Sequence, residues 1–200
     1  MTITPVITTL ELYTQQLASW ERKLLLDTGY NKKPLWEAIM EANTSWIAAS
    51  DGSHNDFRAS YAWTLSNGTT IVQHGQGLVQ GNPITAFREE LYGLLAIYCT
   101  LYHITHYYDI YKQLTIQPHV DATTVIKYHQ YIINSTYPNT PYMDHIDIYP
   151  IMHRYHHELK ARGIEVLEAL KVPSQRGTGT IKADQPTSLH QHADDIARKY

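Results

Sequence analysis

An apolar run from Trp46 to Ser50 is followed at once by Asp51, Gly52 and Ser53. The run predicts a short buried strand that ends in a carboxylate, and Gly52 with Ser53 predicts that the chain turns there. In sheets flanked by helices, ligand sites collect beyond the carboxyl ends of parallel strands, where an aspartate is held by rigid backbone and faces solvent. The pattern therefore indicates a candidate metal-binding carboxylate. A strand followed by Asp-Gly is also a common plain turn, and that alternative stays open here.

Composition limits the chain to an ordinary globular protein. Two hundred residues suit one domain with or without a small appendage; the apolar fraction of 43% allows a core, and 18% charged residues argue against disorder. The lone Cys99 excludes an internal disulfide and a cysteine-based zinc finger, and it fits a reducing compartment. The sequence has no leader-like start and no apolar stretch of about eighteen residues. We therefore expect an intracellular protein, cytoplasmic or nuclear, without a membrane partner.

The formal net charge of −3 bears on nucleic acid as a partner. Domains that bind nucleic acid are usually basic, so this balance argues against tight binding by charge alone. It leaves open an enzyme that holds a polyanion through bound metal ions.

The first half of the chain predicts two helices followed by a three-strand meander. Apolar residues at helical spacing over 9–28, and Pro34 ahead of 35–43, predict the two helices. Strands are expected over 45–50, 58–66 and 69–76. Asn67 and Gly68 lie between the last two strands and supply the backbone angles that a tight hairpin turn needs.

A long helix is expected from about residue 84 to residue 98. Phe87, Leu91 and Leu94 belong to its wide apolar stripe. Glu90 lies beside this stripe, where a carboxylate pairs with a cation, caps the edge of the stripe or points into a site. Arg88 and Glu89 are expected to face solvent.

The second half alternates strands with helices. Residues 114–120 predict a strand that ends at Asp121, although Asp121 is equally a good N-cap for the next helix. Pro118 is awkward in a central strand because it cannot donate to the ladder. The remaining elements are a helix over 150–162, a strand over 164–172, a loop over 173–186 and a helix over 188–199. The crossovers predict a mixed sheet in which the first and fourth strands are neighbours, so that Asp51 and Asp121 meet at one edge.

These elements and their motifs resemble the ribonuclease H family. The motifs are Ser50-Asp51-Gly52-Ser53, Phe87-Arg88-Glu89-Glu90-Leu91, Val120-Asp121 and Ala193-Asp194-Asp195-Ile196-Ala197. Together with Trp63 in the second strand, they look like the ribonuclease H domains of retroelement reverse transcriptases. The resemblance covers residues 45–200 and implies an α/β fold with a mixed five-stranded sheet, a three-strand meander plus two parallel strands, flanked by helices. Residues 1–44 would be a short helical N-terminal extension.

The resemblance implies a metal-dependent endonuclease that cleaves the RNA strand of RNA–DNA hybrids, recognised by duplex shape and 2′-hydroxyls. In the family an acidic group binds two divalent ions. Asp51 would then bridge both ions. Glu90, Asp121 and Asp194 would complete their shells, and hard oxygen ligands of this kind suit Mg²⁺ or Mn²⁺. Candidate substrate contacts are Ser53, Lys127, Arg176 and Lys182, and the three basic residues among them also fit ordinary surface charge.

Two alternatives from other classes stay open. The family often carries a histidine in the loop after the last strand, and residues 172–177 contain none. The first alternative is therefore a catalytically silent ribonuclease-H-like module that binds nucleic acid or connects other domains. The resemblance to retroelement domains also allows the chain to be part of a larger retroelement polyprotein. The second is a small histidine-rich protein that binds Zn²⁺ through helical pairs such as His153 with His156. Asp195 also competes with Asp194 as the last acidic ligand.

Overall fold

A computed structural model gives the structure over residues 9–26, 28–30, 33–55, 58–172, 182 and 184–199. The helices are α1 (Leu10–Gln15), α2 (Ser19–Leu26), α3 (Leu35–Glu41), α4 (Ala86–Tyr107), α5 (Thr123–Ile133), α6 (Tyr149–Ala161) and α7 (Pro186–Ala197), with a 3₁₀ helix over Thr140–His145. The strands are β1 (Thr28–Tyr30), β2 (Trp46–Asn55), β3 (Arg58–Ser66), β4 (Ile71–Leu78), β5 (Leu114–Val120), β6 (Ile164–Val166) and β7 (Leu170–Lys171). Within these ranges no helix is both long and apolar enough to cross a membrane.

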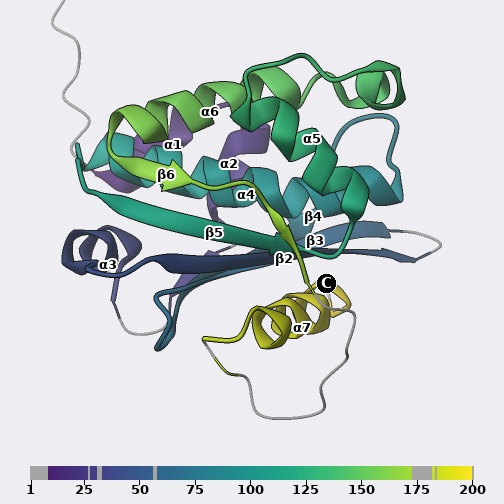
Figure 1. Ribbon diagram of the computed structural model, residues 1–200. Helices are drawn as coiled ribbons and strands as arrows, with labels where there is room; N and C mark the ends of the chain where they lie inside the picture. Colours follow the sequence, from purple (N-terminus) through teal and green to yellow (C-terminus); the bar gives the residue numbers. More distant parts are fainter. Residues whose placement is uncertain are drawn as a thin grey trace, which may run out of the picture.

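The described strands form one mixed sheet in the order β1-β4-β3-β2-β5-β6, with β7 also paired to β5. β2, β3 and β4 form the predicted antiparallel meander, and β2 and β5 are parallel neighbours, as predicted. The α/β fold is thus confirmed. The sheet has seven strands instead of five because β1 joins the β4 edge and the final strand is split in two. Figure 1 shows α4, α5 and α6 covering one face of the sheet and α7 lying against the other.

The strand predicted over 164–172 is interrupted opposite Pro118. β6 pairs with residues 114–116 of β5 and β7 pairs with residues 119–120, so the break between them lies beside Gln117 and Pro118. Proline has no N–H for a ladder bond, and pairing stops on this side of β5 at that point. Within the break, the side-chain amide of Gln117 donates instead to the carbonyl oxygen of Glu168 at 2.7 Å.

α4 is the central helix of the core. Thr85 caps it by accepting a hydrogen bond from the N–H of Arg88 at 3.1 Å. The helix is buried around most of its circumference because it packs against the sheet on one side and α6 and α2 on others, and it continues to Tyr107. The expectation that Arg88 and Glu89 face solvent is therefore wrong, and both side chains are buried.

The segment before residue 45 packs on α4 and on the sheet. The helix predicted over 9–28 is instead α1 and α2 followed by β1, which pairs antiparallel with β4. α2 contributes Glu21, whose carboxylate accepts a hydrogen bond from the Tyr155 hydroxyl at 2.5 Å and lies 3.3 Å from Nε2 of His103. Burial opposes ionisation, but the hydrogen bonds from His103 and Tyr155 hold the pKa of Glu21 below its usual range. The division of the chain at residue 44 stays a prediction.

Candidate metal centre

Asp51 lies inside strand β2. The turn expected at Gly52 and Ser53 is wrong, since both residues continue β2 and pair with Tyr61 and Ser60 of β3. The antiparallel partner supports β2 beyond the point where its parallel pairing with β5 ends, at Ala49. Asp51 therefore occupies the carboxyl edge of the parallel pair, as predicted, and it is held there by a continuous strand.

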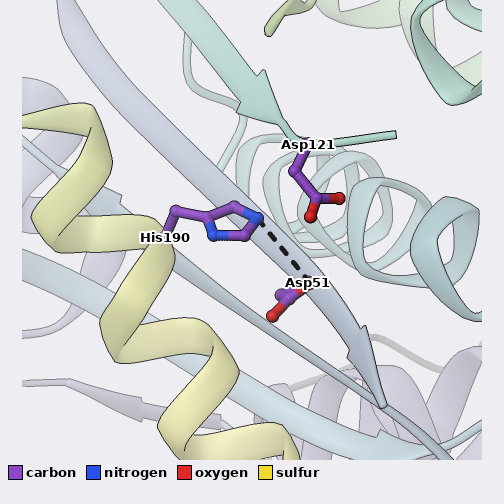
Figure 2. A group of neighbouring side chains, drawn as sticks. All are labelled: Asp51, Asp121 and His190. Carbon is purple, nitrogen blue, oxygen red and sulfur yellow. Dashed lines mark ion pairs between the residues drawn. The ribbon is translucent and has the colours of Figure 1, made fainter. Parts of the chain in front are cut away.

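Asp121 follows the last residue of β5. The structure does not use it as a helix cap, because Ala122 occupies the N-cap position of α5. Its side chain is exposed. One carboxylate oxygen each of Asp51 and Asp121 and one ring nitrogen of His190 all lie within 4.8 Å of one another. Figure 2 shows the three side chains converging from β2, the end of β5 and α7.

Glu90 brings a third carboxylate to this place from α4. The helix can approach the sheet closely because Gly93 has no side chain, and a Cβ there would lie 2.7 Å from the Cβ of Ser50. Burial, followed by the charges of Asp51 and Asp121 and a hydrogen bond with Asp51, raises the pKa of Glu90 to about 10. Its Oε2 atom is buried and has no hydrogen-bond partner among the described residues.

Asp51 is the centre of the group. Burial, followed by the charges of Asp121 and Asp194 and a hydrogen bond with Asp194, raises the pKa of Asp51 to about 8. Without a cation, the carboxyl groups of Asp51 and Glu90 therefore ionise less readily than exposed ones. Crowded carboxyl groups with pKa values raised in this way are typical of a site that is completed by a cation.

Asp194 reaches the group from α7, which packs on β3 through small residues. Ala193 and Ala197 contact Ala62, and the hydroxyl of Ser60 donates to the carbonyl oxygen of Ala197 at 2.8 Å. Asp194 is 13% exposed and interacts with Asp51, whereas Asp195 is exposed. The structure thus places Asp194, and not Asp195, beside the other acids.

His190 was missed by the sequence analysis. It lies one helical turn before Asp194, and its Nε2 is 3.6 Å from Oδ1 of Asp51 (Figure 2). Burial lowers the pKa of His190, although the charges of Asp121 and Asp194 oppose this. The spacing of four residues between His190 and Asp194 was visible in the sequence, because residues so spaced share one face of a helix.

No protein-family model matches the chain, and no curated protein matches it in sequence. Among solved structures, the chain is similar to LC11 ribonuclease H1, isolated from compost, at 10% identity and a TM-score of 0.50, over 78% of this chain and 94% of that one. The chain has the ribonuclease H-like fold. A ribonuclease H1 from the archaeon Halobacterium salinarum is 18% identical with a TM-score of 0.45, over 76% and 99% of the two chains. The foamy viral protease-reverse transcriptase, in complex with an RNA/DNA hybrid, is 12% identical with a TM-score of 0.44, over 86% and 21%.

The donor set of this ribonuclease H-like chain fits a divalent cation. Four carboxylates, from Asp51, Glu90, Asp121 and Asp194, approach one another at one edge of the sheet. Oxygen donors of this kind bind Mg²⁺ and Mn²⁺. The unpartnered Oε2 of Glu90 also fits a metal ligand better than a structural carboxylate, because buried polar atoms normally have a hydrogen-bond partner.

Three of the four predicted substrate contacts lie in the described residues. Ser53 is half-buried on β2, where its carbonyl oxygen accepts a hydrogen bond from the Ser60 hydroxyl at 3.3 Å. Lys127 is exposed on α5, and Lys182 is exposed ahead of α7. Arg176 lies outside the described residues. The role of all four as substrate contacts stays a prediction.

The structure gives less support to the alternative of a histidine-rich Zn²⁺-binding protein. His153 and His157 on α6 approach each other with their Nε2 atoms 3.0 Å apart, as a pair. In the part of the chain that the structure describes, the one group of three metal-ligating side chains is Asp51, Asp121 and His190, in which carboxylates predominate.

Proposed function

We propose that this chain is a metal-dependent endonuclease that hydrolyses the RNA strand of RNA–DNA hybrids. The observation that carries the proposal is the position of Asp51, which interacts with Glu90, Asp121 and Asp194 at the carboxyl edge of the parallel strands. The ribonuclease H-like fold supports it, and the motifs that resemble that family assign the metal site to these same four residues.

The proposed roles follow from these positions. Asp51 faces the other carboxylates from the rigid centre of the sheet and would contact both of two Mg²⁺ or Mn²⁺ ions. Glu90 on α4, Asp121 after β5 and Asp194 on α7 would hold the ions from three sides. When bound, such ions activate a water molecule and stabilise the leaving oxygen of a phosphodiester.

The substrate assignment rests on the motifs that resemble the family. An enzyme for hybrids must distinguish RNA from DNA without reading sequence, which duplex shape and the 2′-hydroxyl allow. Exposed Lys127 and Lys182 would contact phosphates. A place within a larger retroelement polyprotein is part of the same proposal.

A panel of labelled duplexes tests the proposal. The protein is incubated with an RNA–DNA hybrid, double-stranded RNA or double-stranded DNA, with Mg²⁺ or Mn²⁺, beside Asp51→Asn. We expect cleavage of the RNA strand of the hybrid with either ion and none in the variant, because asparagine keeps the shape of aspartate without its charge. Cleavage of all three duplexes would overturn the substrate assignment.

A folded wild-type protein that cuts no duplex would overturn the proposal. The alternative of a silent nucleic-acid-binding or connecting module would then be the better account. The net charge of −3 would then favour a connecting module over a nucleic-acid-binding one, since it provides little general attraction for a polyanion. Binding of the uncut hybrid in the same reactions would separate a binding module from a connecting one.

A further inference from the structure

The metal centre has two kinds of donor atom. The three converging ligand atoms are two carboxylate oxygens, from Asp51 and Asp121, and a ring nitrogen of His190. Glu90, which interacts with Asp51 and Asp121, contributes only oxygen. The motifs of the first strand, the helix and the late helix predicted carboxylates alone, so the nitrogen donor changes which ion the site should prefer.

His190 differs from His129 and His103, two buried histidines of the core whose ring nitrogens all have partners. In His129, Nδ1 accepts a hydrogen bond from the N–H of Ala169 at 3.0 Å, and Nε2 lies 2.7 Å from the Tyr98 hydroxyl. In His103, the two ring nitrogens lie 2.7 Å from the Tyr13 hydroxyl and 3.3 Å from Glu21. The Nε2 of His190 is buried and has no hydrogen-bond partner among the described residues, since 3.6 Å to Asp51 is beyond a hydrogen bond.

The carboxylate on the same helix already has partners. Oδ1 of Asp194 accepts a hydrogen bond from Nε of Arg198 at 2.5 Å, and Oδ2 accepts one from the amide of Gln191 at 3.2 Å. α7 therefore presents to the centre one carboxylate that is partly neutralised and one imidazole nitrogen that makes no hydrogen bond. This nitrogen is the stronger candidate for a direct bond to an ion.

We propose that His190 is a direct metal ligand, and that the ion it holds with Asp51 and Asp121 is Mn²⁺ in preference to Mg²⁺. Imidazole nitrogen binds transition metals well, whereas Mg²⁺ selects oxygen ligands and keeps its water. An ion held by carboxylates alone, Glu90 among them, could be either Mg²⁺ or Mn²⁺. This inference rests on the metal centre of the proposed function and adds its ion preference.

The test measures metal binding to the protein without nucleic acid. Mn²⁺ is added to the metal-free protein, and electron spin-echo spectroscopy detects whether a ¹⁴N nucleus is bonded to the ion. Calorimetry gives the affinities for Mn²⁺ and Mg²⁺ in the wild type, in His190→Ala and in His192→Ala. His192 is the matched control because it lies on the same helix, half-buried, with its ring facing His74 and not the acids.

We expect a nitrogen signal in the wild type and in the control, and its loss in His190→Ala. The affinity for Mn²⁺ should fall at least about tenfold in His190→Ala, because removing a ligand costs no less than removing a group that orients one. The affinity for Mg²⁺ should change less than about twofold. All samples, including the one called the wild type in this experiment, carry His153→Gln and His157→Gln, since Nε2 atoms 3.0 Å apart form a second candidate chelating pair.

Three results would overturn the inference. The first is the absence of a bonded nitrogen on the Mn²⁺ that is bound to the wild-type protein. The second is an equal loss of affinity for Mn²⁺ and for Mg²⁺ in His190→Ala. The third is a nitrogen signal that persists in His190→Ala, which would assign the ligand to another histidine such as the nearby His119. Because no nucleic acid is present, these results are independent of whether the protein cuts a hybrid. Failure to bind either ion would overturn the proposed function as well.

Discussion

Gly52 lies so close to Glu90 that a Cβ added to the glycine would come within 2.8 Å of the backbone nitrogen of Glu90. The same added atom would lie 2.8 Å from the Cβ of Glu89, so two consecutive residues of α4 contact this point of β2. Gly52 directly follows Asp51. The close approach of strand and helix therefore fixes how the Asp51 and Glu90 carboxylates face each other.

Gly52→Ala should separate β2 from α4. Because the atoms in the way are mainly backbone, the structure must shift, and we expect a loss of about 1–3 kcal/mol in the free energy of unfolding. The affinity for divalent ions should fall as well, since the Asp51 and Glu90 carboxylates move apart. Denaturant unfolding and calorimetry measure the two effects. Ser53→Ala, one residue further along β2, is the control and should change neither the free energy of unfolding nor the affinity for divalent ions. If Gly52→Ala also leaves both quantities unchanged, the contact between β2 and α4 at Gly52 is loose.

The raised pKa of Glu90 predicts how stability depends on pH in the absence of metal. Glutamate in the unfolded chain ionises at about pH 4, whereas Glu90 in the folded protein stays protonated up to about pH 10. Between these values the unfolded state binds fewer protons, so the free energy of unfolding falls as pH rises. Glu90→Gln removes the contribution of Glu90 to this dependence, whereas the contribution of Asp51, whose pKa is also raised, remains. The unfolding free energy of the variant should fall less steeply than that of the wild type, by up to about 1.4 kcal/mol per pH unit.

The comparison is best made between about pH 7 and about pH 9. Below this window the histidines also contribute to the pH dependence of stability. Burial lowers the pKa of His129 to about 3 and that of His156 to about 4, whereas histidine in the unfolded chain titrates at about pH 6.5. Denaturant unfolding at a series of pH values measures the slope. Glu158→Gln, exposed on α6, should leave it unchanged. Equal slopes for the wild type and Glu90→Gln would mean that Glu90 is ionised in the folded protein.

A chain of buried hydrogen bonds connects three helices to the break between β6 and β7. Nδ1 of His129 accepts from the N–H of Ala169, so Nε2 carries the ring proton and donates to the Tyr98 oxygen at 2.7 Å. The Tyr98 hydroxyl is then free to donate to Nδ1 of His156 at 3.2 Å. Every member of the chain therefore has a partner.

Tyr98→Phe should leave buried groups of His129 and His156 without partners. We expect a loss of about 1–3 kcal/mol in the free energy of unfolding, measured with denaturant. The affinity for metal should not change, since the chain lies outside the metal centre. Tyr137→Phe, on a side chain that is 79% exposed, is the matched control and should have little effect. Equal stability of the two variants would contradict the hydrogen-bonded chain.

Exposed Lys127 and Lys182 provide a test of substrate contact. If they contact phosphates, Lys127→Ala and Lys182→Ala should weaken hybrid binding at low salt, because each contact releases counterions. The slope of the logarithm of affinity against that of salt concentration should become shallower by up to about 0.9 per contact. Fluorescence anisotropy measures both quantities in the Asp51→Asn background, where the hybrid stays intact. Lys160→Ala, exposed on α6, should match the parent, and identical slopes in all variants would exclude the two contacts.

The meander and its parallel neighbour were predictable from sequence because local rules decide them. Asn67 with Gly68 specifies the turn between β3 and β4, and the crossover helix α4 makes β5 parallel to β2. The meeting of Asp51 and Asp121 follows from that topology. β1 was not predictable, since its three residues are too few to show a period of two.

Long-range partners explain what the sequence analysis missed near the metal centre. Arg88 was expected in solvent, yet its guanidinium donates to both carboxylate oxygens of Asp147, at 3.0 and 2.6 Å, from 59 residues away. Glu89 likewise pairs with His54 of β2 at 2.7 Å. Helical periodicity cannot identify such partners, because it describes one helix and not its neighbours. His190 is different, because its spacing of four residues from Asp194 is visible in the sequence, whereas the family resemblance placed a histidine in the loop at residues 172–177.

Analysis of the cut ends of the RNA tests the central claim most directly. The hybrid is cleaved with Mn²⁺ by the wild type and by Asp51→Asn, and the new RNA ends are identified by mass spectrometry. If Asp51 and its neighbours bind metal ions that activate water to attack the phosphodiester, each cut by the wild type should leave a terminal phosphate on one RNA fragment and a terminal hydroxyl on the other. Asp51→Asn should leave the strand whole. A 2′,3′-cyclic phosphate, or cutting that survives in Asp51→Asn, would show that another group performs the chemistry and would contradict the proposed metal centre.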